Sequence, residues 1–385
     1  MFTKEQKIVS LIRNAVFKTP LPENFPTSFS EEEVGELYQI AKRHDLAHLV
    51  AFALKNNRIG LPKTAEAMFQ KQLFGAVFRC EKMQYELKRI SGLLEKEKIP
   101  FVPLKGSILR TYYPEIWMRT SSDIDLFVRE SDLQRLSELI TESAGYTAEG
   151  QWNGERSFFS PDGIHLEVHF YDDADEEEGL IFREIWDHVS PSEGFEYRMQ
   201  MEWEYFYIHH VLHMAKHFSH GGCGIRPFLD LILMRIQIEL EPEKKREYLE
   251  KFNLAPFAVA SEKLASVWFG TDSHSPLTEQ MEDYLFGAGI YGSIENKVAL
   301  EKSGKGKQLS GFFAHVWLSY DDIKYQYPAM IRHKWLYPFC QVRRWFRLIF
   351  CGGLKRSFSF LHHNLNMSSE KVEKVSQLMD ELNLS

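Results

Sequence analysis

The chain has 385 residues, a formal net charge of −8 and 14% aromatic residues. This length is enough for about two to three domains of ordinary size. The negative net charge argues against a general nucleic-acid binder, because such a protein would carry a basic domain. The four cysteines lie far apart and form no Cys-x-x-Cys pair, which argues against a structural zinc site or a disulfide framework.

The amino terminus lacks the basic-then-apolar plan of a secretory signal. The sequence contains no uninterrupted run of about eighteen apolar residues, so no membrane span is expected. The expected location is therefore a reducing cytoplasm.

Residues 1–98 show helical periodicity. Ser30, followed by the acidic residues Glu31–Glu33, predicts a helix N-cap with an acid-rich first turn. A long amphipathic helix is expected from Ala65 to Leu94. These features define a helical N-terminal region.

The pattern changes at residue 99. The apolar run Ile99–Leu104 and the alternating segment Ser122–Val128 predict buried strands. A helix is expected over Ser131–Ala144. The turn signal Pro161–Gly163 then predicts a hairpin over residues 156–170.

This order predicts an α+β fold, in which a small mixed sheet with its helices occupies residues 99–200. The sheet is embedded between the N-terminal region of residues 1–98 and a C-terminal region, residues 201–385, that is also mostly helical in pattern.

Asp123 and Asp125 lie two residues apart on a predicted strand, so both side chains point to the same face. Two carboxylates this close repel each other unless a cation lies between them. Glu167, between the apolar residues Leu166 and Val168, supplies a third carboxylate from a later strand. We expect the three residues to be catalytic and to bind two Mg²⁺ ions, with Mn²⁺ as an alternative, because hard divalent cations prefer oxygen ligands. One ion would activate an attacking hydroxyl and the other would neutralise a triphosphate.

A phosphate cradle is expected at Lys105-Gly106-Ser107. These residues lie at a predicted strand-to-helix turn, where glycine allows close approach of the backbone and a helix N-terminus attracts anions. Arg119 is a second candidate phosphate contact. Each feature alone is common in proteins without a site there, and the prediction rests on their combination in this order.

The sequence resembles the uncharacterised nucleotidyltransferase family of the DNA polymerase beta-like nucleotidyltransferase superfamily. The residues that carry the resemblance are Leu104–Ser107, Tyr113-Pro114, Arg119, Ser122–Val128, Gly145-Tyr146 and Leu166–His169. The resemblance is strongest over residues 99–170 and continues more weakly to about residue 235. It implies Mg²⁺-dependent transfer of a nucleoside monophosphate from a nucleoside triphosphate. Glu167 departs from the Asp that is commoner at the third acidic position.

Histidines crowd the predicted helix from Trp203 to His220. They are His209, His210, His213, His217 and His220. One interpretation makes them ordinary core or surface histidines, and another makes them a pocket wall. In the resembled family a His-x-x-Lys-His helix followed by an Arg and an Asp recurs, and this pattern matches His213, Lys216, His217, Arg226 and Asp230. The resemblance therefore implies that Lys216 or His217 contacts the triphosphate.

Two further segments have an unusual charge. The acidic run Asp172–Glu178 is expected to be a solvated loop, because like charges repel each other. The segment 334–356 mixes aromatic residues with arginines and lysines, and we expect a helix that packs its aromatic face on the body of the protein. The alternatives for 334–356 are nucleic-acid binding or weak peripheral contact with an anionic membrane.

The sequence thus predicts a nucleotidyltransferase that uses a nucleoside triphosphate and an unidentified small-molecule, protein or nucleic-acid acceptor, through a hydroxyl or phosphate group. An alternative is a nucleotide-binding module of the same fold without turnover. A third hypothesis is a metal hydrolase built on the histidine helix.

Overall fold

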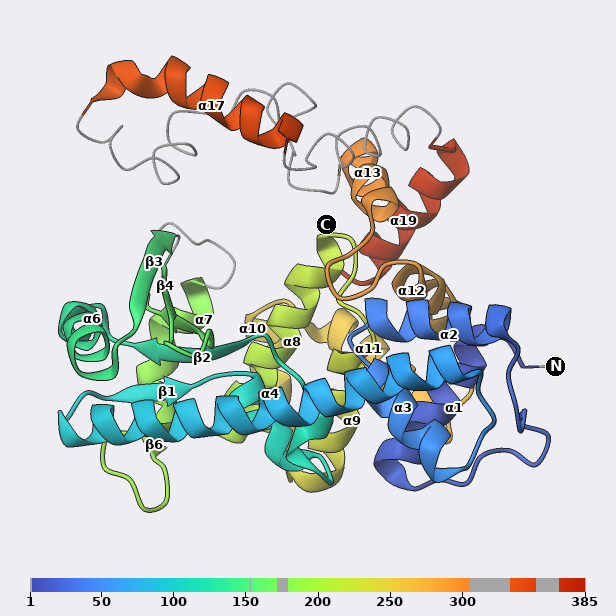
Figure 1. Cartoon of the computed structure of the whole chain (residues 1–385). Helices are drawn as coiled ribbons and strands as arrows, with labels where there is room; N and C mark the ends of the chain where they lie inside the picture. The colour runs from blue at the N-terminus through green and yellow to red at the C-terminus, as the bar shows by residue number, and fades with distance from the viewer. Residues whose placement is uncertain (1, 153, 172–178, 305–332, 351–366, 385) are drawn as a thin grey trace.

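The computed structural model of the chain describes residues 2–152, 154–171, 179–304, 333–350 and 367–384. The N-terminal region is helical, as predicted, and its helices are α1 (Lys4–Phe17), α2 (Glu31–Arg43), α3 (Ala47–Asn56) and α4 (Lys63–Lys96). The predicted N-cap is confirmed, because the Ser30 hydroxyl accepts from the backbone N–H of Glu33 and the Glu33 carboxylate accepts from that of Ser30. Helix α4 has 34 residues and reaches from the other N-terminal helices to the sheet (Figure 1).

A five-stranded sheet in the order β1-β2-β5-β4-β3 follows α4. Its strands are β1 (Phe101–Pro103), β2 (Asp123–Val128), β3 (Thr147–Trp152), β4 (Glu155–Phe159) and β5 (His165–His169). Strands β2 and β5 are parallel, whereas the other neighbouring strands are antiparallel. The predicted α+β fold class is confirmed. The shorter elements of this region are α5 (Gly106–Leu109), η1 (Arg110–Tyr112), η2 (Ile116–Met118), α6 (Glu130–Ala144), α7 (Gly179–Glu184), η3 (Ile185–His188), β6 (Val189–Pro191) and β7 (Met199–Met201).

The two faces of the sheet differ because side chains alternate along each strand. On one face Ile124, Leu126 and Leu166 are buried in a hydrophobic core with residues of α4 and α6. The opposite face carries Asp123 and Asp125, and also Phe127, whose ring stacks on Phe182 of α7 with centroids 4.8 Å apart. The acidic residues of β2 therefore lie on the face of the sheet opposite this core.

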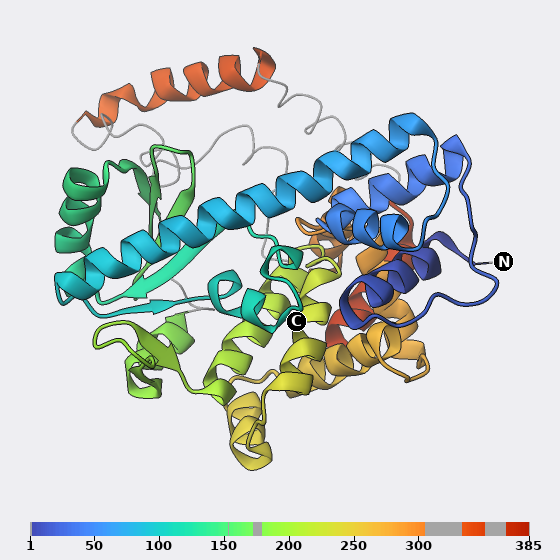
Figure 2. The same ribbon diagram turned by 60° about the horizontal axis from the view of Figure 1, so that its bottom comes forward.

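The C-terminal region is helical as well, and Figure 2 shows its helices packed beside the N-terminal ones. They are α8 (Trp203–Ser219), α9 (Arg226–Gln237), α10 (Pro242–Lys251), α11 (Ala255–Phe269), α12 (Pro276–Phe286), α13 (Ile294–Ser303) and α19 (Ser369–Glu381). Their buried side chains form one core with those of α1–α3. The proposed division at residues 98 and 200 stays a prediction, but the two helical regions share a core.

Strand β3 and the two-stranded β6–β7 sheet were not predicted from the sequence. Strand β3 lies at the sheet edge, and its residues Thr147, Ala148 and Glu149 are exposed. Consecutive exposed residues such as Thr147–Glu149 do not give the alternation of apolar and polar residues that predicts a half-buried strand. The β6–β7 pair is short, with three residues in each strand.

The described part of the basic aromatic segment is helical, as predicted, and forms η4 (Lys334–Leu336) and α17 (Tyr337–Phe350). Trp335 and Phe339 are each 66% exposed, so these two rings do not pack on the body as expected. Residues 351–356 and the acidic run 172–178 lie outside the described residues, so the expectations for them stay predictions. None of the helices in the described ranges has the length and apolar character needed to cross a bilayer.

Candidate functional site

The three predicted carboxylates meet on one face of the sheet. In the parallel pairing of β2 with β5, Asp125 lies opposite Glu167 and Asp123 lies opposite His165. Neighbouring residues in register point to the same side, so Asp123, Asp125 and Glu167 form a carboxylate cluster. Asp125 is buried, whereas the Glu167 side chain is 20% exposed. The alternation of strand residues is the local cause of this arrangement.

Two histidines and a lysine contact the carboxylate cluster. The Nε2 atom of His169 lies 3.0 Å from Oδ1 of Asp125, and Lys105 Nζ lies 3.2 Å from the same oxygen. The Nδ1 atom of His165 lies 3.2 Å from Oε1 of Glu167. These contacts fix the orientation of the carboxylates, which is the role that outer partners play around metal ligands.

The cluster carries more negative charge than its neighbours balance. Burial alone would raise the pKa of Asp125, but Lys105 and the hydrogen bond from His169 together hold it well below its ordinary value. Burial and the negative charges of Asp125 and Asp123 raise the pKa of Glu167 to about 8. Without a further cation, therefore, the carboxylates do not all stay charged at neutral pH.

The predicted phosphate cradle lies at the end of β1. The backbone N–H of Leu104 donates to the carbonyl of Asp125, which places Lys105 beside the carboxylate cluster. Lys105 has φ 42° and ψ −116°, a conformation that costs a non-glycine residue about 1–3 kcal/mol. A Cβ at Gly106 would lie 3.2 Å from both side-chain atoms of Ser121, so the turn is closely packed at this position. A strained backbone held in place beside the carboxylate cluster is the reason to treat this turn as a candidate functional turn.

A second group of charged residues, the arginine cluster, lies beside the carboxylates. Arg119 is buried, and its Nε lies 3.0 Å from Oδ1 of Asp230, which also accepts from the Tyr113 hydroxyl at 2.7 Å. The Nη1 atom of Arg226 lies 2.7 Å from Oδ2 of Asp45. We define the arginine cluster as Arg119, Arg226, Asp45 and Asp230. In it, unlike in the carboxylate cluster, each arginine has a carboxylate partner.

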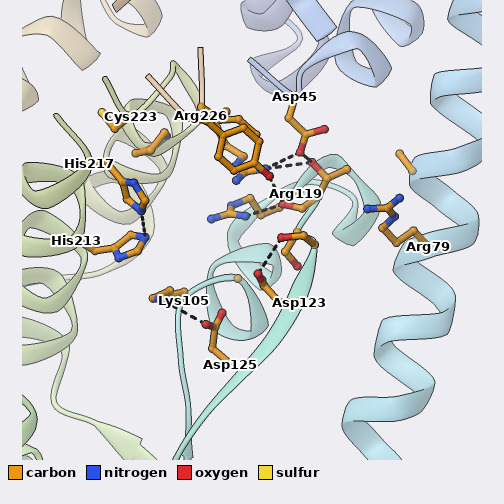
Figure 3. A pocket seen from close by; sticks show the side chains of 18 of the residues that line it. Asp45, Arg79, Lys105, Arg119, Asp123, Asp125, His213, His217, Cys223 and Arg226 are labelled. Carbon is orange, nitrogen blue, oxygen red and sulfur yellow. Dashed lines mark hydrogen bonds and ion pairs between the residues drawn. The ribbon is translucent and has the colours of Figure 1, made fainter. Parts of the chain in front are cut away.

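Helix α8 turns part of its histidine face toward the site. The Nε2 atoms of His213 and His217 lie 3.1 Å apart, and both residues face the carboxylates in Figure 3. His210 is buried, with Nε2 3.2 Å from the carbonyl of Pro227. His209 is also buried, which agrees with the interpretation that some of these residues are core histidines.

These groups enclose a cavity of about 490 Å³ (Figure 3). Of the predicted site residues, the structure brings Lys105, Gly106, Arg119, Asp123, Asp125, Glu167 and His217 to its wall. Ser107 and Lys216, although described, are not among the lining residues. Ser107 is buried and its backbone N–H donates to the carbonyl of Leu104.

His210 and His213 also line the cavity, as the pocket-wall interpretation of the histidine helix predicts. Other walls were not predicted from the sequence. Arg79 extends toward the cavity from α4, Asp45 lies at the turn between α2 and α3, and Tyr291 reaches it from the loop between α12 and α13. The resemblance had pointed to Arg226, but Arg79 and Tyr291 carry no local sequence signal.

The donor atoms fit a divalent metal. Two groups of three residues could each hold a metal ion, because each residue offers one ligand atom and the three atoms lie within 4.8 Å of one another. The first group is Asp123, His165 and Glu167, and the second is Asp125, Glu167 and His169. Glu167 belongs to both groups. The carboxylate oxygens suit Mg²⁺, and the imidazole nitrogens widen the choice toward Mn²⁺ or zinc. In the described part of the chain, no such group contains a histidine of α8.

Comparisons with known proteins place this site in a family. A search of solved structures finds the Thermotoga maritima CCA-adding enzyme complexed with tRNA, at 12% identity over 80% of this chain and 82% of that chain, with a TM-score of 0.23. A comparison with curated proteins gives no match. The family described as "uncharacterised nucleotidyltransferase" matches residues 30–270, from α2 to the end of α11, and includes both clusters. The chain therefore belongs to the uncharacterised nucleotidyltransferase family.

Proposed function

We propose that this protein is a metal-dependent nucleotidyltransferase that transfers a nucleoside monophosphate from a nucleoside triphosphate to a hydroxyl or phosphate acceptor. The observation that carries the proposal is the register of β2 and β5, which places three carboxylates on one wall of a cavity. Family membership supports the same reaction class. In this reaction an acceptor hydroxyl gives its proton to a carboxylate of the cluster, its oxygen bonds to the α-phosphorus, the α–β anhydride bond breaks, and pyrophosphate leaves with the electron pair of that bond. A phosphate acceptor attacks through an oxygen that is already ionised.

The residues of the carboxylate cluster would hold the metal, which we propose to be two Mg²⁺ ions, with Mn²⁺ as the alternative. Bound there, the metal would lower the pKa of the acceptor hydroxyl and offset the charge of the triphosphate. His169 holds Asp125 in place, and His165 holds Glu167, through the contacts at 3.0 and 3.2 Å. These histidines orient the ligands without needing to bind the substrate.

The cations around the cavity would position the phosphates. Lys105 lies on the cradle side, and Arg79 approaches from α4 (Figure 3). Arg119 and His217, which also line the cavity, remain proposed phosphate contacts, although Asp230 already accepts from Nε of Arg119. For Ser107 and Lys216 the proposed contact requires a movement of the backbone or of α8, because neither lines the cavity.

The test is a pyrophosphate-release assay with the four ribonucleoside triphosphates, with Mg²⁺, Mn²⁺ or EDTA, over a panel of small-molecule, protein and nucleic-acid acceptors. We expect Asp125→Asn to lower the metal-dependent rate by about 10³-fold, because a metal at such a site supplies several kcal/mol of charge stabilisation. Asp123→Ala is expected to act in the same direction. Asp162→Asn is the matched control, because Asp162 is an exposed acid in the turn between β4 and β5.

Unchanged release in both cluster variants would refute the assignment of the site. Nucleotide binding by the wild-type protein without pyrophosphate release would instead favour the nucleotide-binding module. Metal analysis of protein purified without chelators tests the hydrolase hypothesis, which requires a co-purified transition metal. A cytoplasmic location is part of the proposal and agrees with the free cysteines Cys80, Cys223 and Cys340 of the described residues.

A further inference from the structure

Tyr291 is an exposed aromatic side chain that the C-terminal region brings to the cavity. It lies in the loop between α12 and α13, lines the cavity, and is 75% exposed. It also lies outside residues 30–270, the part of the chain that matches the family. Its presence in the site is therefore a feature of this structure and does not follow from the family assignment.

The loop that carries Tyr291 is held on both sides. The backbone N–H of Ile290 donates to the carbonyl of Arg43, and that of Ser293 donates to the carbonyl of Gly221. The side-chain amide of Asn296 donates to the carbonyls of Gly221 and Tyr284, at 3.1 and 2.9 Å.

Two glycines let this loop approach its neighbours closely. Gly289 has φ +80°, and a Cβ there would lie 2.7 Å from the carbonyl oxygen of Arg43. Gly292 has φ +71°, and a Cβ there would lie 2.8 Å from the carbonyl carbon of Gly221. The exposed ring of Tyr291 is thus presented by a fixed backbone, which lowers the entropic cost of binding to it.

Asp45 contributes a negatively charged hydrogen-bond acceptor to the cavity that Tyr291 lines. The Asp45 side chain is 42% exposed and its Oδ2 accepts from Arg226 and from the Thr120 hydroxyl, both at 2.7 Å. The loop of Tyr291 is bonded to Arg43, two residues before Asp45. A carboxylate repels phosphate groups but accepts hydrogen bonds from hydroxyl and amino groups.

On these grounds we propose that Tyr291 and Asp45 form a nucleoside subsite, in which the base stacks on Tyr291 and Asp45 accepts a hydrogen bond from an O–H or N–H of the nucleoside. The inference rests on the proposed function. In this arrangement the phosphates extend from Asp45 toward Lys105 and the carboxylate cluster. A nucleoside triphosphate can use this subsite, whereas an inorganic polyphosphate has no base or sugar to contact Tyr291 and Asp45.

The experiment compares two ligands by calorimetry in Mg²⁺, an ATP analogue with a non-hydrolysable α–β linkage and inorganic tripolyphosphate. Tyr291→Ala is expected to weaken binding of the analogue about tenfold, because the base loses its stacking partner. Its affinity for tripolyphosphate is expected to stay unchanged. Tyr291→Phe keeps the ring and should keep the affinity. Tyr85→Ala, an exposed tyrosine of α4 that does not line the cavity, is the matched control.

Equal affinity of Tyr291→Ala and wild type for the analogue would overturn the inference, and so would an equal loss for both ligands. The proposed function is tested separately by Asp123→Ala, which should weaken both ligands. If Asp123→Ala weakens both and Tyr291→Ala weakens neither, only the subsite is wrong. If wild type binds neither ligand, the proposed function fails and the subsite fails with it.

Asp45→Asn tests the polar half of the subsite. It should weaken the analogue and leave tripolyphosphate binding equal or tighter, because the substitution removes a negative charge. Preference of wild type for the ribose over the 2′-deoxyribose analogue, lost in Asp45→Asn, would identify a ribose hydroxyl as the donor. Weakening of both analogues without such a preference would identify a base amino group, and unchanged binding would overturn the role of Asp45.

Discussion

The carboxylate cluster and the arginine cluster line the same cavity but balance their charges differently. In the arginine cluster, Arg119 is paired with Asp230 and Arg226 with Asp45. In the carboxylate cluster, Lys105 pairs with Asp125, and burial and the charges of Asp125 and Asp123 raise the pKa of Glu167 to about 8. Buried charge that is paired within the protein supports structure, whereas buried charge that lacks compensation indicates a missing ligand. The difference therefore separates the residues that stabilise the cavity walls from those that we propose to bind a cation.

The strongest test of this comparison is Asp230→Ala. Asp230 is fully buried, and its removal leaves the guanidinium of Arg119 without its carboxylate and Tyr113 without its acceptor. We expect the free energy of unfolding to fall by about 3–5 kcal/mol, the usual cost of breaking a buried pair. Chemical denaturation with EDTA present measures this loss.

Tyr113→Phe is the matched control for Asp230→Ala. It removes the 2.7 Å hydrogen bond but keeps the ion pair, so the expected cost is about 1 kcal/mol. If Asp230→Ala costs no more than this control, the ion pair does not stabilise the fold and the distinction between the two clusters fails.

A smaller effect is expected from His44, which supports the helical side of the cavity next to Asp45. His44 is fully buried, with Nε2 3.4 Å from the carbonyl of Phe286, and burial lowers its pKa to about 4. The folded state therefore disfavours the protonated ring. The stabilisation from the neutral ring is complete above pH 6.5, the ordinary value, and is lost as the pH falls to 4. The expected loss is about 3 kcal/mol.

The measurement is the free energy of unfolding between pH 7 and 4 for wild type and His44→Gln, which keeps a donor but does not titrate. The difference between the two proteins should change by about 3 kcal/mol over this range, in favour of the variant at low pH. His220→Gln, at an exposed histidine, is the control and should follow wild type. Parallel curves for wild type and His44→Gln would contradict the prediction.

The carboxylate cluster was predictable from the sequence because its geometry is local. The two-residue spacing of Asp123 and Asp125 on a strand fixes their common face, and Glu167 follows from the same alternation in another strand. The pairing of the two strands required long-range information: the resemblance to the nucleotidyltransferase superfamily implied a third acid on a later strand, and the structure shows that this strand, β5, lies parallel to β2. The helices with clear caps and apolar stripes were predictable for the same reason.

The arginine cluster and Tyr291 were not predictable in this way. Asp45 and Arg226 are 181 positions apart and meet only because the helices before and after the sheet share a core. Arg79 lies on the polar face of an amphipathic helix, where a solvated cation is the ordinary expectation. Tyr291 lies in a glycine-containing turn, which predicts a surface loop and says nothing about what the loop faces. Residues that line a cavity from several helices leave no periodic trace in the sequence.

The smallest and sharpest test is Glu167→Gln, measured with and without metal. Glu167 lies directly opposite Asp125 in the sheet, and burial together with the negative charge of Asp125 disfavours the ionised form of Glu167 in the folded state, which Gln does not have to suppress. In EDTA the substitution should therefore raise the free energy of unfolding by about 1 kcal/mol or leave it unchanged, the reverse of the loss expected for Asp230→Ala. Glu149→Gln, at an exposed acid of the edge strand β3, is the matched control.

In Mg²⁺ the wild-type protein should become more stable than Glu167→Gln, because a cation that binds the folded state stabilises it more when it binds more tightly. The variant lacks one ligand and should gain less from the metal than wild type does. A loss of stability in EDTA, larger than that of Glu149→Gln, would show that the contact of Glu167 with His165 supports the fold. In that case the carboxylate cluster would be structural like its neighbour, and the contrast between charges paired within the protein and charges that require a cation would not hold.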